Sequence, residues 1–222
     1  MIRLLFLCLC LFTTWGATSG QAAPVKVLFF GDSITKGKGV PPDQRWTALA
    51  AAQSHGAFVE INEGKFGRPA AAVNEFSKAV EKYKGDSAIA VLVIALGTND
   101  SRDKAPNCVE KTTNSIAKEI GIARAQAPQW RIVICAPYNI NTDALKESHA
   151  IGPMREQNLI GMSKAFKDLA ARESCGFIDF YGVIPPSSLI VDGVHPDATG
   201  HAAIAALAEP TLDATVAGPK AK

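Results

Sequence analysis

The sequence has almost no excess charge, and no stretch in which charge of one sign accumulates. Its 222 residues carry 23 lysines and arginines against 21 aspartates and glutamates, which gives a net charge of +2 at pH 7. Proteins that bind nucleic acid or anionic membranes gather their cations on one face or along one helix. Here the cations are scattered, so we expect neither nucleic acid nor an anionic membrane surface as a partner.

Cysteine is also sparse: the chain contains five, two of them within the first ten residues. The others are Cys108, Cys135 and Cys175, and three thiols allow at most one disulfide, whose pairing the sequence leaves open. Their spacing matches no zinc motif, and we expect neither a metal nor a cofactor. Cys135 ends an apolar run, which favours a small buried side chain over a nucleophile.

No apolar run in the sequence is long enough to span a membrane. The N-terminus has Arg3, an unbroken apolar stretch at residues 4–12, and small residues before position 24. This is the pattern of a secretory signal peptide. We therefore predict a signal peptide at residues 1–23 and a mature chain that is exported, either periplasmic or secreted, without stable membrane insertion. An uncleaved anchor is the less favoured alternative, and the oligomeric state stays open.

The remaining sequence alternates between short apolar runs and stretches with helical periodicity. The expected strands are residues 25–30, 58–62, 88–96, 131–135 and 176–178. The expected helices are residues 46–54, 70–84, 107–126, 151–172 and 198–207. Alternating strands and helices imply right-handed crossovers and a parallel sheet. We predict one three-layer α/β/α domain at residues 24–212, with a five-stranded parallel sheet of flavodoxin-like order. A flexible tail is expected at residues 213–222.

Polar clusters follow the first three expected strands. They are Asp32-Ser33, the loop 62–67 and the segment 97–100, and an Asp-x-x-His pair, Asp192 and His195, comes just before the last helix. Since the carboxyl ends of parallel strands meet at one edge of the sheet, we expect these groups in one crevice. Acyl transfer by serine needs a base, a group that orients the base, and donors for the developing oxyanion. The chain offers a candidate for each.

These clusters resemble the four motif blocks of the SGNH (GDSL) hydrolases. The blocks read Gly-Asp-Ser-Ile-Thr at 31–35, Asn-Glu-Gly-Lys-Phe-Gly at 62–67, Gly-Thr-Asn-Asp at 97–100 and Asp-Gly-Val-His-Pro at 192–196. They occur in the family's order and span nearly the whole chain after residue 23. The resemblance implies that Ser33 is the nucleophile, His195 the general base and Asp192 the residue that orients it.

The same resemblance implies an oxyanion hole. Its donors would be the backbone N–H groups of Ser33 and Gly67 and the side-chain amide of Asn99. Gly67 is favoured because the family pattern places this glycine last in its loop, and Gly64 is the lesser candidate. A glycine lets a backbone N–H approach the oxyanion closely, and an asparagine donates without titrating.

Several polar residues near the motifs have open roles. Asp32, Arg68, Tyr138 and Asn139 are candidates for contact with substrate, although for Asp32 a hydrogen bond within its own loop is favoured. Asp179, after the fifth expected strand, is a rival for the acid of the triad, with a structural role at the strand end as the favoured reading.

The sequence thus predicts an exported serine esterase that works through an acyl-enzyme and acts on a small-molecule or carbohydrate ester. Short, polar loops favour short acyl groups such as acetyl on a sugar. A lysophospholipase or thioesterase of the same family is the first alternative, and a glycan-binding module without catalysis is the second. A flavodoxin-like domain that binds phosphate or flavin at residues 31–35 would need a helix to begin directly after that loop, where glycines and prolines stand instead.

Overall fold

A computed structural model describes residues 24–145 and 151–218 of the chain. The predicted signal peptide lies outside these residues, as do positions 146–150 and the last four residues of the expected tail. Among the described residues, no helix combines the length and the apolar character needed to cross a bilayer.

The core of the fold is a five-stranded parallel sheet with the order β2-β1-β3-β4-β5. Its strands are β1 (Val25–Gly31), β2 (Phe58–Gly64), β3 (Ile89–Ala95), β4 (Arg131–Cys135) and β5 (Gly176–Ile178). This confirms the predicted flavodoxin-like order. The chain reverses its direction of winding between β1 and β3, and in such sheets ligands bind at the carboxyl ends of the strands beside this reversal.

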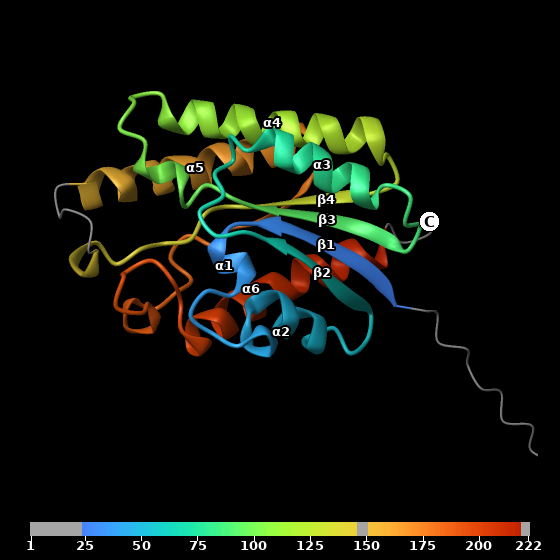
Figure 1. Cartoon of the computed structure of the whole chain (residues 1–222), viewed down its shortest axis with the longest axis horizontal. Coiled ribbons are helices and arrows are strands. Elements are labelled where there is room, and N and C mark those ends of the chain that lie inside the picture. The colour runs from blue at the N-terminus through green and yellow to red at the C-terminus, as the bar shows by residue number, and fades with distance from the viewer. Residues whose placement is uncertain (1–23, 146–150, 219–222) are drawn as a thin grey trace, which may run out of the picture.

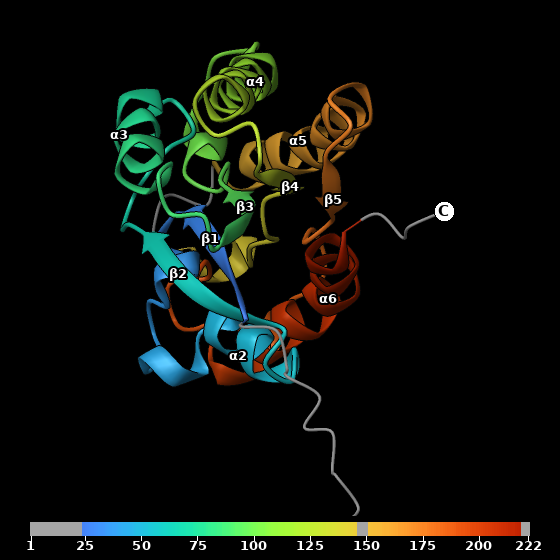
Figure 2. The same ribbon diagram turned by 90° about the vertical axis from the view of Figure 1, so that its right-hand side faces the viewer.

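In the described part of the chain, six α-helices surround the sheet. They are α1 (Ser33–Lys36), α2 (Trp46–Gln53), α3 (Val73–Tyr83), α4 (Cys108–Gln126), α5 (Gly152–Arg172) and α6 (Ala198–Ala217). Short 3-10 turns lie at Pro42–Gln44, Asp100–Arg102, Thr142–Ala144 and Pro186–Ser188. Helices α3, α4 and α5 cover one face of the sheet and α2 and α6 cover the other (Figures 1 and 2). The three predicted layers are therefore present.

Both faces of the sheet are buried, which explains why the strands read as continuous apolar runs. Alternate residues of β1 enter different cores. Leu28 and Phe30 pack under α3, α4 and α5, while Val27 and Phe29 pack under α2 and α6. The strands are thereby clamped on two sides, and their carboxyl ends form a rigid edge for the loops that follow.

Two elements differ from the sequence prediction. A short helix, α1, begins at Ser33 directly after β1, where we expected only a loop, because the carboxylate of Asp32 caps it. Helix α6 continues to Ala217, so residues 213–217 are helical instead of part of a tail. It continues because Leu212 is fully buried and Val216 packs against the same core, and this apolar contact extends the helix past Pro210.

Candidate active site

Ser33 lies at the point where β1 passes into α1. The Asp32 side chain accepts a hydrogen bond of 2.9 Å from the backbone N–H of Ile34, which starts the helix one residue after the strand. Gly31 permits this sharp turn, since a Cβ there would come within 2.1 Å of Thr35 Oγ1 and 2.9 Å of the Ala95 carbonyl oxygen. The serine is consequently held on a short, well-braced turn at the edge of the sheet.

Ser33, His195 and Asp192 form one hydrogen-bonded chain. Ser33 Oγ lies 2.7 Å from His195 Nε2, and His195 Nδ1 lies 2.6 Å from Asp192 Oδ2. The other oxygen of Asp192 accepts the backbone N–H groups of Val194 and His195, each at 3.0 Å. Because a carboxylate only accepts, Nδ1 carries a proton toward Asp192 and Nε2 is left as an acceptor for the serine hydroxyl. This is the arrangement of a serine nucleophile, its base and the group that orients the base.

The pKa values of His195 and Asp192 favour a neutral imidazole beside an ionised carboxylate. Burial lowers the pKa of His195 below its usual 6.5, and the nearby Asp192 carboxylate offsets only part of that effect. Burial acts to raise the pKa of Asp192, but the hydrogen bonds from the His195 and Val194 backbone and from the imidazole hold it at about 2. At neutral pH the pair therefore consists of a neutral base beside an ionised carboxylate.

A cavity of about 230 Å³ opens beside this chain. Ser33, His195, Gly67 and Asn99 contribute to its lining, so the structure brings the expected oxyanion donors to the same place as the serine. Gly67 has φ of +72°, a conformation that favours glycine, and open space lies where a Cβ would stand. The Asn99 amide donates one hydrogen bond of 3.2 Å to the Arg68 carbonyl oxygen, and its second N–H is a further donor.

Three lining residues of this cavity escaped the sequence analysis: Lys38, Phe66 and Arg102. Phe66 is 61% exposed although it is a large apolar residue, and Lys38 lies 3.6 Å from Asp192 Oδ2. Each lies within or up to five residues from a motif block, and Phe66 is not part of the apolar pattern of any helix or strand. A single large apolar residue in a glycine-containing loop, outside any helix or strand pattern, could have identified Phe66 as a lining residue.

Asn62 and Gly64, in the second motif block, support the site from outside the cavity. Asn62 donates to the Thr35 carbonyl oxygen at 2.7 Å and to Thr47 Oγ1 at 2.9 Å, which ties β2 to α1 and α2. A Cβ on Gly64 would lie 2.3 Å from the backbone nitrogen of Lys36. Gly64 is thus required for close packing against α1, and of the two glycines considered, it is Gly67 that lines the cavity.

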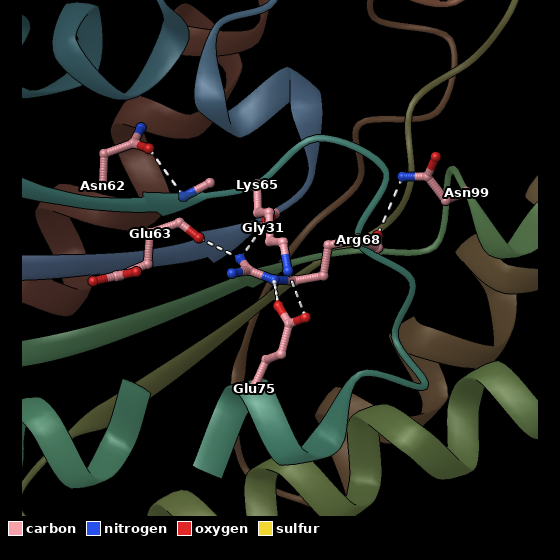
Figure 3. Close-up of polar contacts among 8 residues, drawn as sticks. Gly31, Asn62, Glu63, Lys65, Arg68, Glu75 and Asn99 are labelled. Atoms are coloured by element: carbon pink, nitrogen blue, oxygen red, sulfur yellow. Dashed lines mark hydrogen bonds and ion pairs between the residues drawn. The ribbon is translucent and has the colours of Figure 1, made fainter. Parts of the chain in front are cut away.

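Arg68 does not face substrate, which corrects the sequence prediction. Its side chain is buried and points back under the loop, where Nη1 donates to the carbonyl oxygens of Gly31 (2.7 Å) and Glu63 (Figure 3). The guanidinium also bonds Glu75 and lies 4.0 Å from the centre of the Phe30 ring. This direction was not predictable from the sequence, because an arginine beside a motif has the same sequence context whether its side chain turns inward or outward.

Tyr138 and Asn139 likewise face protein instead of the cavity. The Tyr138 ring is buried and stacks on Phe180, with 4.9 Å between ring centres. Asn139 donates to the carbonyl oxygen of Ile184 and accepts its N–H, so it clamps two loops together. Neither residue is among those that line the cavity beside Ser33, so the structure gives no support to the predicted substrate contacts.

The carboxyl groups of Asp32 and Asp179 each make hydrogen bonds that stabilise the local fold. Asp32 is fully buried and caps α1, as the favoured interpretation had it, and burial raises the pKa of this carboxyl to about 7. Because Asp32 already occupies the start of α1, this helix offers no open cradle for a phosphate. Both carboxylate oxygens of Asp179 accept the Ser163 hydroxyl at 2.9 Å, whereas the carboxylate that bonds His195 is that of Asp192.

In the described part of the chain, no three His, Cys, Asp or Glu side chains are placed to hold a metal ion. Cys108, Cys135 and Cys175 are all free thiols, which answers the open question of their pairing.

Comparison with solved structures finds the same fold in esterases. A carbohydrate acetylesterase family member from Sinorhizobium meliloti matches with a TM-score of 0.73 at 20% identity, over 87% of this chain and 99% of that one. An aryl esterase from M. smegmatis matches with a TM-score of 0.71 at 19% identity, over 85% of this chain and 98% of that one. A member of the lipolytic G-D-S-L family from Veillonella parvula DSM 2008 has a TM-score of 0.65 at 21% identity, over 83% and 96%. No curated protein sequence matches the chain significantly.

The sequence profile of the GDSL-like lipase/acylhydrolase family matches residues 29–203, which is most of the chain and includes all four motif blocks. The chain therefore belongs to the GDSL-like lipase/acylhydrolase family and is an ester-hydrolysing enzyme.

Proposed function

We propose that the protein is an exported serine esterase in which Ser33 is the nucleophile, His195 the general base and Asp192 its orienting acid. The observation that carries this proposal is the unbroken hydrogen-bond chain from Ser33 Oγ through the imidazole to Asp192, with links of 2.7 and 2.6 Å, at the edge of an open cavity. Export is inferred from the signal-peptide pattern of residues 1–23.

In the acylation step, Ser33 Oγ attacks the ester carbonyl carbon while His195 Nε2 takes the hydroxyl proton. The carbonyl oxygen becomes an oxyanion, which accepts hydrogen bonds from the Ser33 and Gly67 backbone N–H groups and from the Asn99 amide. When the intermediate collapses, the bond to the alcohol oxygen breaks and His195 returns the proton to the leaving alcohol. The product is an acyl group on Ser33.

In the deacylation step, water takes the place of the alcohol. His195 removes a proton from water as it attacks the acyl carbon, and the same donors hold the second oxyanion. Collapse of this intermediate releases the acid and returns the proton to Ser33. Asp192 keeps the imidazole in one orientation and stabilises its charged form in both steps.

The cavity favours a short acyl group, and we propose acetyl esters of carbohydrates as the substrate class. Its volume of about 230 Å³ is small for a long acyl chain. The similarity in fold to a carbohydrate acetylesterase supports this choice. A lysophospholipase or thioesterase would need an apolar channel, and among the described residues Phe66 is the one large apolar residue that lines this cavity.

A glycan-binding module without catalysis is the alternative from another class. Binding of a glycan without catalysis does not require an imidazole that is hydrogen-bonded to both a serine and a carboxylate. The intact chain of Ser33, His195 and Asp192 therefore favours the enzyme.

The test is hydrolysis of p-nitrophenyl acetate, butyrate and octanoate by residues 24–222, beside Ser33→Ala and a control, Ser115→Ala, in α4, whose hydroxyl donates to the Lys111 carbonyl oxygen. We expect Ser33→Ala to lose nearly all activity, Ser115→Ala to keep it, and acetate to be the best substrate. Equal activity in wild type and Ser33→Ala would refute the proposed nucleophile. Preference for octanoate would favour the lipid esterase, and N-terminal sequencing of the mature protein tests export.

A further inference from the structure

We propose that the alcohol part of the natural ester contains a ring, and that an apolar face of this ring packs on Phe66 beside the catalytic serine. This contact rests on the esterase function proposed above and specifies the substrate of the same site. The ring belongs to the alcohol because the proposed acyl group is acetyl, which has only a methyl group beyond its carbonyl. Sugar rings and aromatic rings both have an apolar face, and the two pairs of esters described below distinguish them.

Phe66 is 61% exposed, whereas the phenylalanines on either side of it in the sequence, Phe58 and Phe76, are buried in the two cores. A single exposed apolar side chain is common on protein surfaces and by itself indicates no function. Phe66 differs because it lines the cavity that Ser33 and His195 also line. Its ring is therefore available to a substrate bound in that cavity.

Phe66 occupies the second position of a tight turn. The backbone N–H of Arg68 donates to the Lys65 carbonyl oxygen at 3.3 Å, and Gly67 takes the third position with φ of +72°, where a type II turn needs a glycine. Both ends of the turn are tied to β1 through the carbonyl oxygen of Gly31. This oxygen accepts the Lys65 backbone N–H at 3.1 Å and the Arg68 guanidinium at 2.7 Å (Figure 3). The turn is therefore fixed before substrate arrives, so packing a ring on Phe66 requires little ordering of the backbone.

The same turn supplies an oxyanion donor. Gly67 follows Phe66 directly, and its backbone N–H is one of the groups proposed to bind the oxyanion. Because the ring and the donor are on consecutive residues of a fixed turn, the Phe66 ring lies close to the ester group that Ser33 attacks. An acetyl group fills only a small part of a cavity of about 230 Å³, which leaves room for the alcohol part against this ring.

A single aromatic side chain suits a ring better than a long alkyl group. In the part of the protein that the structure describes, Phe66 is the one large apolar residue that lines this cavity. A flexible alkyl group would need apolar contacts along its whole length and would lose rotational freedom when it binds. A rigid ring needs only one flat apolar surface, which an aromatic side chain provides with little conformational freedom to lose.

The test compares acetates of primary alcohols that differ in whether the alcohol contains a ring. One pair is benzyl acetate and n-heptyl acetate, and the other is the primary-hydroxyl acetates of methyl glucopyranoside and of the acyclic polyol glucitol. The readout is the ratio of kcat/KM for the cyclic ester to that for the acyclic ester, measured in wild type, Phe66→Ala and Phe66→Tyr. We expect Phe66→Ala to lower this ratio about two- to tenfold in at least one pair, the range that one aromatic contact supports, and Phe66→Tyr to keep it. The pair that responds identifies the ring as sugar or aromatic.

The matched control is Ile160→Ala, which removes an apolar side chain that is 50% exposed on α5 and does not line the cavity. It should keep both wild-type ratios. Ratios unchanged by Phe66→Ala in both pairs, including an equal loss on all the esters, would overturn the ring contact while leaving the esterase intact. A larger loss on the heptyl ester than on the benzyl ester would overturn it as well, because Phe66 would then bind an alkyl group. Hydrolysis that survives in Ser33→Ala would instead overturn the proposed function.

Discussion

Replacing Arg68 with methionine should damage catalysis although the side chain never faces substrate. Arg68 is 7% exposed, and its guanidinium joins the end of β1, through the Gly31 carbonyl oxygen, to the loop that carries Gly67. Its backbone carbonyl oxygen also accepts the Asn99 amide at 3.2 Å (Figure 3). Methionine keeps the contact with Phe30 but removes every one of the side-chain hydrogen bonds.

The magnitude follows from these contacts. A buried hydrogen bond from a charged donor, such as the one to Gly31, is worth about 1.5–3 kcal/mol. The ion pair with Glu75 adds roughly 0–1 kcal/mol, because the Glu75 side chain is 41% exposed. We expect the free energy of unfolding to fall by about 2–4 kcal/mol by these values. Loss of one oxyanion donor costs about 10²–10³ in kcat, so a partial displacement of Gly67 and Asn99 should cost at least about tenfold.

The assay is kcat and KM for p-nitrophenyl acetate together with urea unfolding. The matched control is Lys65→Met, which removes only the exposed ion pair with the same Glu75. We expect Arg68→Met to lower kcat with little change in KM, and Lys65→Met to leave both near wild type. A stable, folded Arg68→Met with kcat within about twofold of wild type, against the larger loss expected, would refute the link between this arginine and the oxyanion hole.

Three further outcomes are expected. Since burial holds the pKa of His195 below 6.5 and the base must be neutral, kcat/KM should fall only at acidic pH, and an apparent pKa above 7 would contradict this. Asp192→Asn should lower kcat by about 10³–10⁴, whereas Asp179→Asn, a carboxylate bonded to Ser163, should leave it near wild type. Among the three free thiols of residues 24–218, only the half-buried Cys175 should react with Ellman's reagent in the native protein, and rapid reaction of more than one would contradict the burial seen here.

The alternation of strands and helices was predictable from local hydrophobic patterns, and the roles of the main site residues were predictable from the resemblance of four motif blocks to a known family. Continuous apolar runs identify strands covered on two faces, whereas the strand order was taken from the general rules of such folds and not from any residue. The ends of parallel strands meet at one edge, which is why Ser33, Gly67 and Asn99 were expected together and are found together.

The direction in which a polar side chain points was not predictable. Arg68 and Arg102 both follow a motif block closely, yet the first turns inward to Gly31 and the second lines the cavity. The difference arises from backbone carbonyl groups that only the folded sheet brings near. The length of α6 was missed for a similar reason, because the burial of Leu212 depends on a core assembled from distant segments.

The most direct test of the account is covalent labelling of residues 24–222 with a fluorophosphonate, followed by tryptic peptide mapping. Cleavage after Lys26 and Lys36 yields peptide 27–36, in which Ser33 is the only serine. The account predicts one phosphonyl group per chain, located on Ser33 in this peptide, and none after Asp192 or His195 is replaced. A label on any other peptide, or none at pH 8 where the imidazole is neutral, would contradict the assignment of Ser33 as the nucleophile.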